Sequence, residues 1–202
     1  MSQLLTIHPK NPQHRLLQIA VDVLNKGGLV VYPTDTSYAL GCHIGDKQAL
    51  AKIIALRRLS KKHQFTIACR DLSELGAYAR VDNSSYRLLK RTTPGPYTFI
   101  LRATKDVPKR LVHQKTRTIG IRVPDNEIAL SLLQLMGEPI MTSTLRLPEA
   151  EAPLQDPLAI CDVLGKQVDL VLDGGIGELN QSTVVDLSGP QAEVIRQGKG
   201  VL

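Results

Sequence analysis

Residues 29–41 decide the fold class and read Leu29-Val30-Val31-Tyr32-Pro33-Thr34-Asp35-Thr36-Ser37-Tyr38-Ala39-Leu40-Gly41. The first four residues are apolar and predict a buried strand, which Pro33 ends because proline cannot donate a hydrogen bond to a sheet. Before this strand, apolar residues at helical spacing predict a helix over residues 12–26, closed by Gly27-Gly28. A helix that leads directly into a buried strand is typical of α/β proteins.

Similar signals recur along the rest of the chain. Asp46 is a candidate N-cap for one helix, and Asp82 or Asn83 for a later one. We expect roughly seven strands and four or five helices, with the last strands joined by short turns. This loose alternation predicts a single-domain α/β (α+β) fold over residues 1–202, with a twisted, mixed parallel and antiparallel sheet flanked by helices. No internal repeat or linker divides the chain.

Charge is distributed unevenly. Residues 1–150 carry 22 Lys and Arg against 11 Asp and Glu (+11), whereas residues 151–202 carry 3 against 8 (−5). A basic body is typical of proteins that bind a nucleotide or tRNA, although charge alone fits simple solubility equally well. Aromatic residues make up 3% of the chain and Trp is absent, so base-stacking platforms for single-stranded nucleic acid are not expected.

Several common motifs are missing from the sequence. It contains no P-loop, no G-x-G-x-x-G after a strand, no G-x-S-x-G and no histidine pattern that suggests a metal site. The run Asp173–Gly177 has the wrong glycine spacing for phosphate binding and predicts a tight turn. Three separated cysteines, no signal peptide and no apolar run of ~18 residues predict a reduced, cytoplasmic protein without a membrane span.

Five segments, in this order and at these spacings, cover nearly the whole chain. They are residues 32–41, the helix end Arg57–His63, Pro94–Leu101, Thr118–Pro124, and Ser182–Asp186 followed by Val194–Gly198. Together they resemble the YrdC family, and in detail its YciO branch. The resemblance implies a twisted α/β sheet with a large, basic concave surface.

The resemblance also implies a reaction. The family joins L-threonine, bicarbonate and ATP into L-threonylcarbamoyl-AMP and releases pyrophosphate, which serves the N6-threonylcarbamoyl modification of adenosine 37 in tRNA. ATP is then a substrate accompanied by Mg²⁺, and no tightly bound cofactor or dedicated metal site is implied. The carbamate of threonine can attack the α-phosphate without a protein nucleophile, so we expect positioning and charge neutralisation rather than a catalytic residue.

Candidate site residues are those that match positions of the family's motifs. Thr36, Arg122 and Ser182 are implied for L-threonine, and Arg57, Thr118, Thr144 and Arg196 for ATP. A guanidinium such as that of Arg122 can grip a carboxylate bidentately, and its spacing of four from Thr118 places both on one strand face. Plain alternatives are a turn hydroxyl for Thr36, a strand-surface ion pair for Arg122, and water-facing positions for Ser182 and Arg196.

Three positions depart from the family pattern. Leu59 stands where a phosphate-binding guanidinium is expected, Ala68 where a histidine is expected, and Arg146 where an amide is expected. A cation lost from a triphosphate site costs ~2–5 kcal/mol, unless Arg146 or His63 restores part of the charge. Because these changes fall at the ATP end, they favour a weakened synthase.

The alternative function is a non-catalytic binder of tRNA or double-stranded RNA that uses the same basic cavity. It rests on the cluster Arg57, Arg58, Lys61 and Lys62. The scarcity of aromatic residues favours recognition of shape and phosphates over base stacking. A charge run is also typical of a solvated face, so the sequence leaves both functions open, and it does not determine the oligomeric state.

Overall fold

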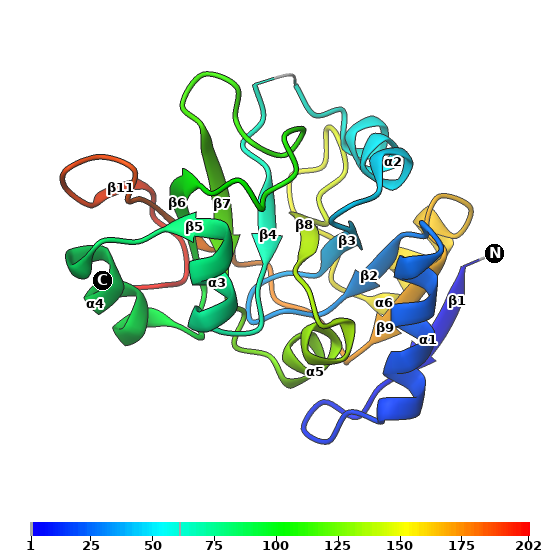
Figure 1. The fold of residues 1–202 in the computed structure, drawn as a ribbon. Coiled ribbons are helices and arrows are strands. Elements are labelled where there is room, and N and C mark those ends of the chain that lie inside the picture. The colour runs from blue at the N-terminus through cyan, green and yellow to red at the C-terminus, as the bar shows by residue number, and fades with distance from the viewer. Residues whose placement is uncertain (1, 61) are drawn as a thin grey trace.

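The computed structural model describes residues 2–60 and 62–202. These residues form eleven strands and six helices (Figure 1). The strands are β1 (Gln3–Thr6), β2 (Val30–Tyr32), β3 (Ala39–His43), β4 (Thr66–Ala68), β5 (Ala79–Arg80), β6 (Tyr97–Ala103), β7 (Thr118–Arg122), β8 (Ile140–Thr144), β9 (Leu170–Asp173), β10 (Thr183–Asp186) and β11 (Glu193–Arg196). The helices are α1 (His14–Asn25), α2 (Lys47–Arg57), α3 (Leu72–Tyr78), α4 (Asn83–Thr92), α5 (Glu127–Met136) and α6 (Pro157–Leu164). Both counts exceed those expected from the sequence.

The strands of the described residues join one sheet, in the order β1-β9-β2-β3-β8-β4-β7-β6-β10-β11, with β5 beside β6. The neighbours β1/β9, β9/β2, β4/β7 and β6/β10 run parallel. The other neighbours run antiparallel, including β3/β8, β8/β4 and β6/β7. The mixed sheet with flanking helices that the sequence predicted is therefore confirmed.

Strands β1, β3 and β5 were not expected from the sequence, and β3 shows why. Its residues Ala39, Leu40, Gly41 and Cys42 include two with low strand propensity. Gly41 is nevertheless required, because a Cβ at this position would lie 2.8 Å from Ile140 Cγ2 and 2.9 Å from Tyr32 Cε1. Close packing between β2 and β8, rather than local propensity, therefore defines this strand.

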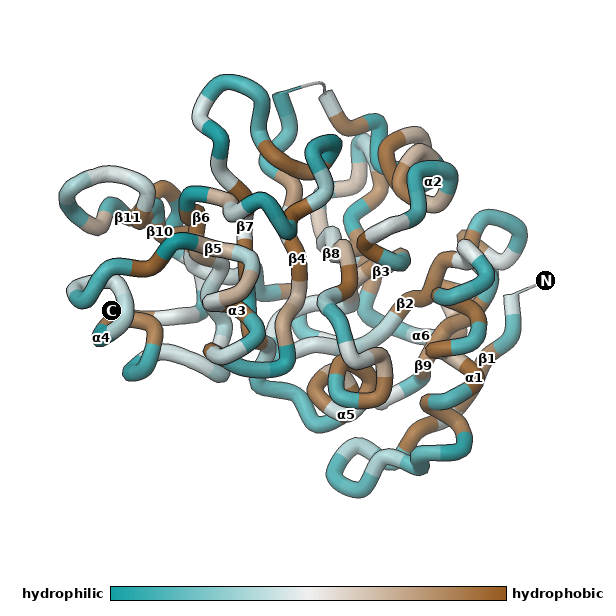
Figure 2. The backbone as a smooth tube through the Cα atoms, in the orientation of Figure 1, coloured by the Kyte–Doolittle hydropathy of each residue, from teal (hydrophilic) through white to brown (hydrophobic). Residues whose placement is uncertain are grey.

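The apolar run before Pro33 is continuous because both faces of the sheet are covered. Consecutive strand residues point to opposite faces, and Val30 and Val31 accordingly belong to two separate core clusters. Helices α1 and α5 pack beside each other on the Val30 face (Figure 1). Figure 2 shows hydrophobic residues concentrated along the central strands and on α5, with hydrophilic residues on the loops. The core thus fixes the strands whose ends carry the polar residues discussed below.

Helix ends follow the expected chemistry. Asp46 accepts hydrogen bonds from the backbone N–H groups of Gln48 and Ala49, and Asp82 accepts one from Ser85. Asp82, rather than Asn83, is therefore the cap of α4. Gly27 adopts a positive φ of 77° after α1, as the glycine pair predicted. Within the described residues, every helix is too short or too polar to cross a membrane.

Gly120 provides a test of the packing between β4 and β7. A Cβ at Gly120 would lie 2.5 Å from Thr66 Oγ1 and 3.0 Å from the Phe65 carbonyl, whereas one at Gly76 of α3 would meet nothing within 4 Å. We expect Gly120→Ala to lower the free energy of unfolding by about 1–3 kcal/mol through overpacking. The matched change Gly76→Ala should raise it by about 0.5–1 kcal/mol through helix propensity. Urea unfolding measures both, and a destabilisation at Gly76 equal to that at Gly120 would contradict the packing assignment.

Candidate functional site

A cavity of about 380 Å³ lies over one face of the sheet, because alternate residues of β6 (Thr98, Ile100) and β8 (Thr142, Thr144) line it. Hydroxyl groups from β4, β6 and β8 line it, together with the amides of Gln64 and Gln181. Four guanidinium groups also line it: Arg57 at the end of α2, Arg122 at the end of β7, Arg146 after β8 and Arg196 at the end of β11. Ile195, whose side chain is 54% exposed, lies at its edge. One face of the sheet and the segments beside it thus form a polar, cationic recess.

The cavity has an excess of positive charge. No Asp or Glu of the described residues lines it, and among its four arginines only Arg122 forms an ion pair with a described carboxylate. Partial burial, and then the charge of Arg146, lowers the pKa of Arg57; partial burial, and then the charge of Arg122, lowers the pKa of Arg196. Both pKa shifts arise first from burial and second from a neighbouring positive charge, and an anion bound here would offset both effects.

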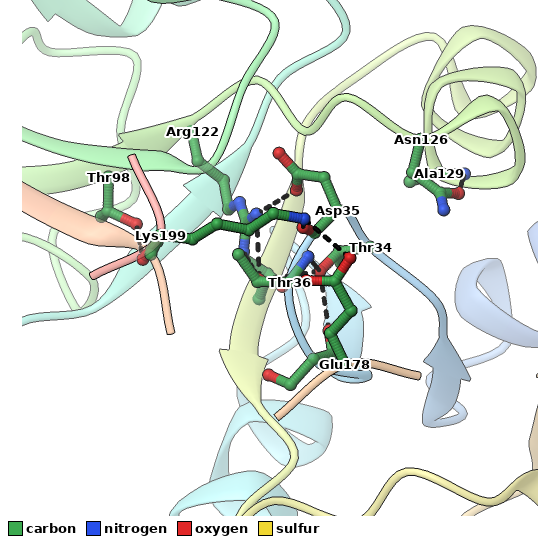
Figure 3. A network of polar contacts seen from close by, with 12 residues as sticks. Thr34, Asp35, Thr36, Thr98, Arg122, Asn126, Ala129, Glu178 and Lys199 are labelled. Carbon is green, nitrogen blue, oxygen red and sulfur yellow. Dashed lines mark hydrogen bonds and ion pairs between the residues drawn. The ribbon is translucent and has the colours of Figure 1, made fainter. Parts of the chain in front are cut away.

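Arg122 and Thr36 are brought together, as the sequence-based assignment requires. Arg122 Nη1 and Nη2 each lie 3.4 Å from Thr36 Oγ1, and Nη2 donates to Asp35 Oδ1 at 2.5 Å (Figure 3). The side chains of Arg122 and Asp35 are 8% and 7% exposed. The ion pair of Arg122 is therefore buried, and not on the strand surface. The hydroxyl of Thr36 faces Arg122 and also lies 3.0 Å from Thr34 Oγ1, whose own turn bonds go to Ser37 O and Thr36 N. Thr36 is 2% exposed and does not itself line the cavity.

Ser182 and Arg196 also meet. Arg196 Nη2 donates to Ser182 O at 2.8 Å and to Ser182 Oγ at 3.3 Å. Ser182 Oγ lies 2.8 Å from Thr98 Oγ1, and both hydroxyls line the cavity. Ser182 is 8% exposed, so it belongs to the cavity wall and not to a water-facing strand surface.

Arg57 and Thr144 line the end of the cavity at β8. Arg57 Nε donates to the Arg146 carbonyl at 3.0 Å, and its Nη1 donates to Ser143 Oγ. Thr118 is different, because it is 1% exposed and does not line the cavity. Its hydroxyl donates to Gln64 Oε1 at 3.0 Å, so it reaches the cavity only through the lining residue Gln64.

The three departures from the family pattern occupy distinct places. Leu59 packs against one core cluster and Ala68 is fully buried in the other. Arg146 and His63 both line the cavity. Position 59 therefore supplies no positive charge to the cavity. The guanidinium of Arg146 enters the cavity instead, from the segment after β8.

The cluster proposed for RNA contact is divided by the structure. Arg57 faces the cavity, whereas the neighbouring Arg58 is exposed and pairs with Glu149 at 2.9 Å. Lys62 is exposed, and Lys61 lies outside the described residues. The backbone explains the split, because Arg58 adopts a left-handed conformation (φ 47°) that turns the chain at the end of α2.

Sequence reasoning missed several residues of the cavity wall and its support. They include Gln64, Thr66, Thr98, Ser143 and Gln181 in the wall, and Asp35 and Lys199 behind it. The consecutive hydroxyls Thr142-Ser143-Thr144 were the available signal, since a buried strand rarely carries three. Among the described residues no group of three or more His, Cys, Asp or Glu is placed to hold a metal ion.

The mixed sheet therefore carries a polar, cationic cavity on one face, which is suited to an anionic ligand. Residues 22–198 match the profile of the Sua5/YciO/YrdC family, described as telomere recombination. The chain therefore belongs to the Sua5/YciO/YrdC family.

Relatives place the chain within that family. It is 54% identical to an uncharacterized protein of Haemophilus influenzae and 52% identical to YciO of Escherichia coli, over 99% of this chain and 97% of each relative. A threonylcarbamoyl-AMP synthase of Coxiella burnetii is 29% identical over 82% of this chain and 89% of its own. Relatives named as synthases are thus more distant than the YciO proteins.

Solved structures agree with this placement. The crystal structure of E. coli YciO has a TM-score of 0.96 at 51% identity, and the match covers 100% of this chain and 98% of that chain. Pyrococcus abyssi Sua5 complexed with L-threonine has a TM-score of 0.89 at 25% identity, covering 98% of this chain and 58% of the longer Sua5 chain.

His63 reports on the charge in the cavity. Burial, and then the charge of Arg57, lowers the pKa of His63 below its ordinary value. We expect Arg57→Gln to raise this pKa part of the way back, and Arg58→Gln, which alters an exposed arginine paired with Glu149, to leave it unchanged. A proton NMR titration of the imidazole resonances measures the effect. Because folding lowers this pKa, stability should fall as the pH drops below about 6.5. An identical His63 pKa in wild type and Arg57→Gln would contradict the assigned cause.

Proposed function

We propose that this protein is an L-threonylcarbamoyl-AMP synthase that converts L-threonine, bicarbonate and ATP into L-threonylcarbamoyl-AMP and pyrophosphate, for the t6A37 modification of tRNA. The supporting observation is that the guanidinium groups lie at separate positions along one cavity. Arg57 contacts Ser143 of β8, Arg122 ends β7, and Arg196 contacts Ser182 beside β10. Since β4, β7 and β6 lie between β8 and β10, the strands beside the outer two arginines are about 19 Å apart.

This spacing matches the chemistry of the proposed product. Threonylcarbamoyl-AMP carries a carboxylate at its threonyl end and a phosphate further along, and ATP extends the negative charge beyond that point. The Coxiella relative named as a threonylcarbamoyl-AMP synthase and the L-threonine complex of Pyrococcus Sua5 support the same substrate class.

We assign the residues of the cavity to the parts of the two substrates as follows. Arg122, Thr36 and Ser182 hold the carboxylate and hydroxyl of L-threonine, while Arg57 and Thr144 hold the outer phosphates. Arg196, which donates to Ser182, is assigned to the nucleotide. Thr118 acts on the nucleotide through Gln64. Because no described acidic residue lines the cavity, Mg²⁺ would be held by the triphosphate rather than by a protein cage.

The reaction then proceeds without a covalent intermediate on the protein. The threonine amine adds to CO₂ derived from bicarbonate and loses a proton, giving a carbamate. A carbamate oxygen attacks the α-phosphorus, and the bond to the β-phosphate oxygen breaks so that pyrophosphate leaves with the electron pair. The arginines neutralise the charge that accumulates on the phosphoryl oxygens, which is the main contribution the cavity makes.

The first test measures pyrophosphate release from L-threonine, bicarbonate and ATP, with and without tRNA. Arg57→Gln should lower kcat/KM about 100-fold, since it removes a preorganised cation from the phosphates. Arg15→Gln makes the same chemical change on the exposed surface of α1 and should leave the rate unchanged. Calorimetry with L-threonine and ATP separately would show which half of the site is intact. Release no faster than in a buffer control would refute the synthase proposal.

A second candidate is binding of tRNA or double-stranded RNA, and it is compatible with the first. The loop between β6 and β7 carries Lys105, Lys109, Lys115 and Arg117, which form no ion pair with any described residue. Gly120 N–H donates to the Phe65 carbonyl at 2.8 Å, so this loop and the α2–β4 loop lie at the same end of the sheet (Figure 1). Both loops could contact phosphates flanking a nucleotide in the cavity.

The RNA proposal predicts a steep salt dependence. The logarithm of tRNA affinity should fall linearly with the logarithm of salt concentration, and Lys109→Gln/Lys115→Gln should make the slope shallower by about 2. The matched variant Lys47→Gln/Lys166→Gln changes the net charge equally and should keep the wild-type slope, which separates local contacts from overall charge. A flat salt response in the wild-type protein would exclude phosphate contacts.

A further inference from the structure

The buried ion pair between Asp35 and Arg122 is incomplete. A single contact joins Asp35 Oδ1 to Arg122 Nη2 at 2.5 Å. The other carboxylate oxygen, Asp35 Oδ2, and the remaining edge donor, Arg122 Nε, are both buried and have no hydrogen-bond partner among the described residues. Unpartnered buried groups of this kind are unfavourable, and more so when they are charged.

Asp35 Oδ2 is a hydrogen-bond acceptor and Arg122 Nε–H is a donor, so the two groups are chemically complementary. Nε–H and one N–H of Nη2 lie along the same edge of a guanidinium, and a carboxylate placed across that edge accepts both bonds as a fork. Asp35 already occupies the Nη2 half of the edge. Asp35 Oδ2 and Arg122 Nε, the two atoms that the second bond of such a fork would join, are the ones left without a partner.

The contacts of Thr36 explain why the fork is open. Both Nη atoms of Arg122 also point at Thr36 Oγ1, at 3.4 Å each, which is long for a hydrogen bond. An anion that binds Arg122 from the cavity would compete with these weak contacts. The guanidinium could then turn its inner edge fully toward Asp35.

Asp35 is itself held from a third segment. Lys199 Nζ donates to the Asp35 carbonyl at 2.8 Å and pairs with Glu178 Oε1 at 2.7 Å (Figure 3). Arg122 lines the cavity, whereas Asp35 does not. The carboxylate therefore stands behind the guanidinium, and not in the path of a ligand.

We propose that Asp35 is a positioning residue that fixes the inner edge of the Arg122 guanidinium and closes a fork on it when the cavity binds an anion. Lys199 holds the Asp35 backbone in place for this contact. The choice of L-threonine as the ligand rests on the proposed function; the positioning of Arg122 does not.

Charge and positioning make opposite predictions for Asp35→Asn. Removal of one negative charge close to Arg122 should strengthen binding of an anion if Asp35 acts only through its charge. Loss of the fork should weaken binding if Asp35 orients Arg122, even though the electrostatic potential has become more favourable. Glu178→Gln changes the net charge equally within the same network and leaves the buried pair intact.

The experiment is calorimetry with L-threonine on wild type, Asp35→Asn and Glu178→Gln. Positioning predicts at least about tenfold weaker binding for Asp35→Asn, and binding within about twofold of wild type or tighter for Glu178→Gln. Unchanged or tighter binding by Asp35→Asn would overturn the inference and leave the proposed function standing.

A second readout does not require a ligand. The ¹⁵Nε–¹Hε NMR signal of Arg122, identified by its loss in Arg122→Lys, should exchange with water at least about tenfold faster in Asp35→Asn than in wild type. If the wild-type protein binds no L-threonine, the threonine half of the proposed function fails, and this exchange rate still decides whether Asp35 fixes Arg122. Equal exchange rates would overturn the inference.

Lys199 provides a variant outside the buried pair, should Asp35→Asn fail to fold. Lys199→Gln removes the bond to the Asp35 carbonyl and should weaken L-threonine binding about threefold and speed the Arg122 Nε–H exchange. Lys166→Gln makes the same change on an exposed position near α6 and should alter neither quantity. Equal effects of the two lysine variants would show that only net charge matters and would overturn the tether.

Discussion

Positive charge that the described residues leave largely unneutralised is the constraint on which the site depends. Four guanidinium groups share one cavity, and a carboxylate among the described residues meets only that of Arg122. Repulsion of this kind is tolerated because fixed acceptors hold the groups: Ser143 and the Arg146 carbonyl for Arg57, and Ser182 for Arg196. These acceptors lie on or beside strands that the apolar core makes rigid. The sheet therefore maintains a positive potential in the cavity, which a bound anionic ligand, rather than acidic residues of the described cavity wall, would neutralise.

The fold could be predicted from the sequence where local signals were strong. The run before Pro33 marked β2, and Asp46 and the glycine pair marked helix ends. Strand β3 could not be predicted, because Gly41 is required by its close contacts with Tyr32 and Ile140, and these residues become its neighbours only after folding. The site followed the same rule. The contact of Thr36 with Arg122 was recoverable through motif resemblance, whereas the support from Asp35, and the retreat of Thr118 behind Gln64, depend on packing between segments that are distant in sequence.

The departures from the family pattern have a physical interpretation once the side chains are placed. Leu59 contributes to the core, so the end of α2 offers one cation to the cavity instead of two. Arg146 enters from the segment after β8, and its main chain and that of Ala150 anchor both arginines. Charge is thereby relocated and not simply lost. In this chain, a phosphate bound at this end would therefore meet a guanidinium from the β8 side as well as one from the end of α2.

The position of Ile195 has a practical consequence. Its side chain is 54% exposed at the cavity edge, on a strand whose four residues are all exposed, so a larger ring can be accommodated there without disturbing the core. The natural sequence contains no Trp. An indole placed at position 195 would therefore be the sole tryptophan fluorophore in the protein, and it would lie beside the recess. Its fluorescence emission should change when a ligand binds in the recess, whatever the chemical identity of that ligand.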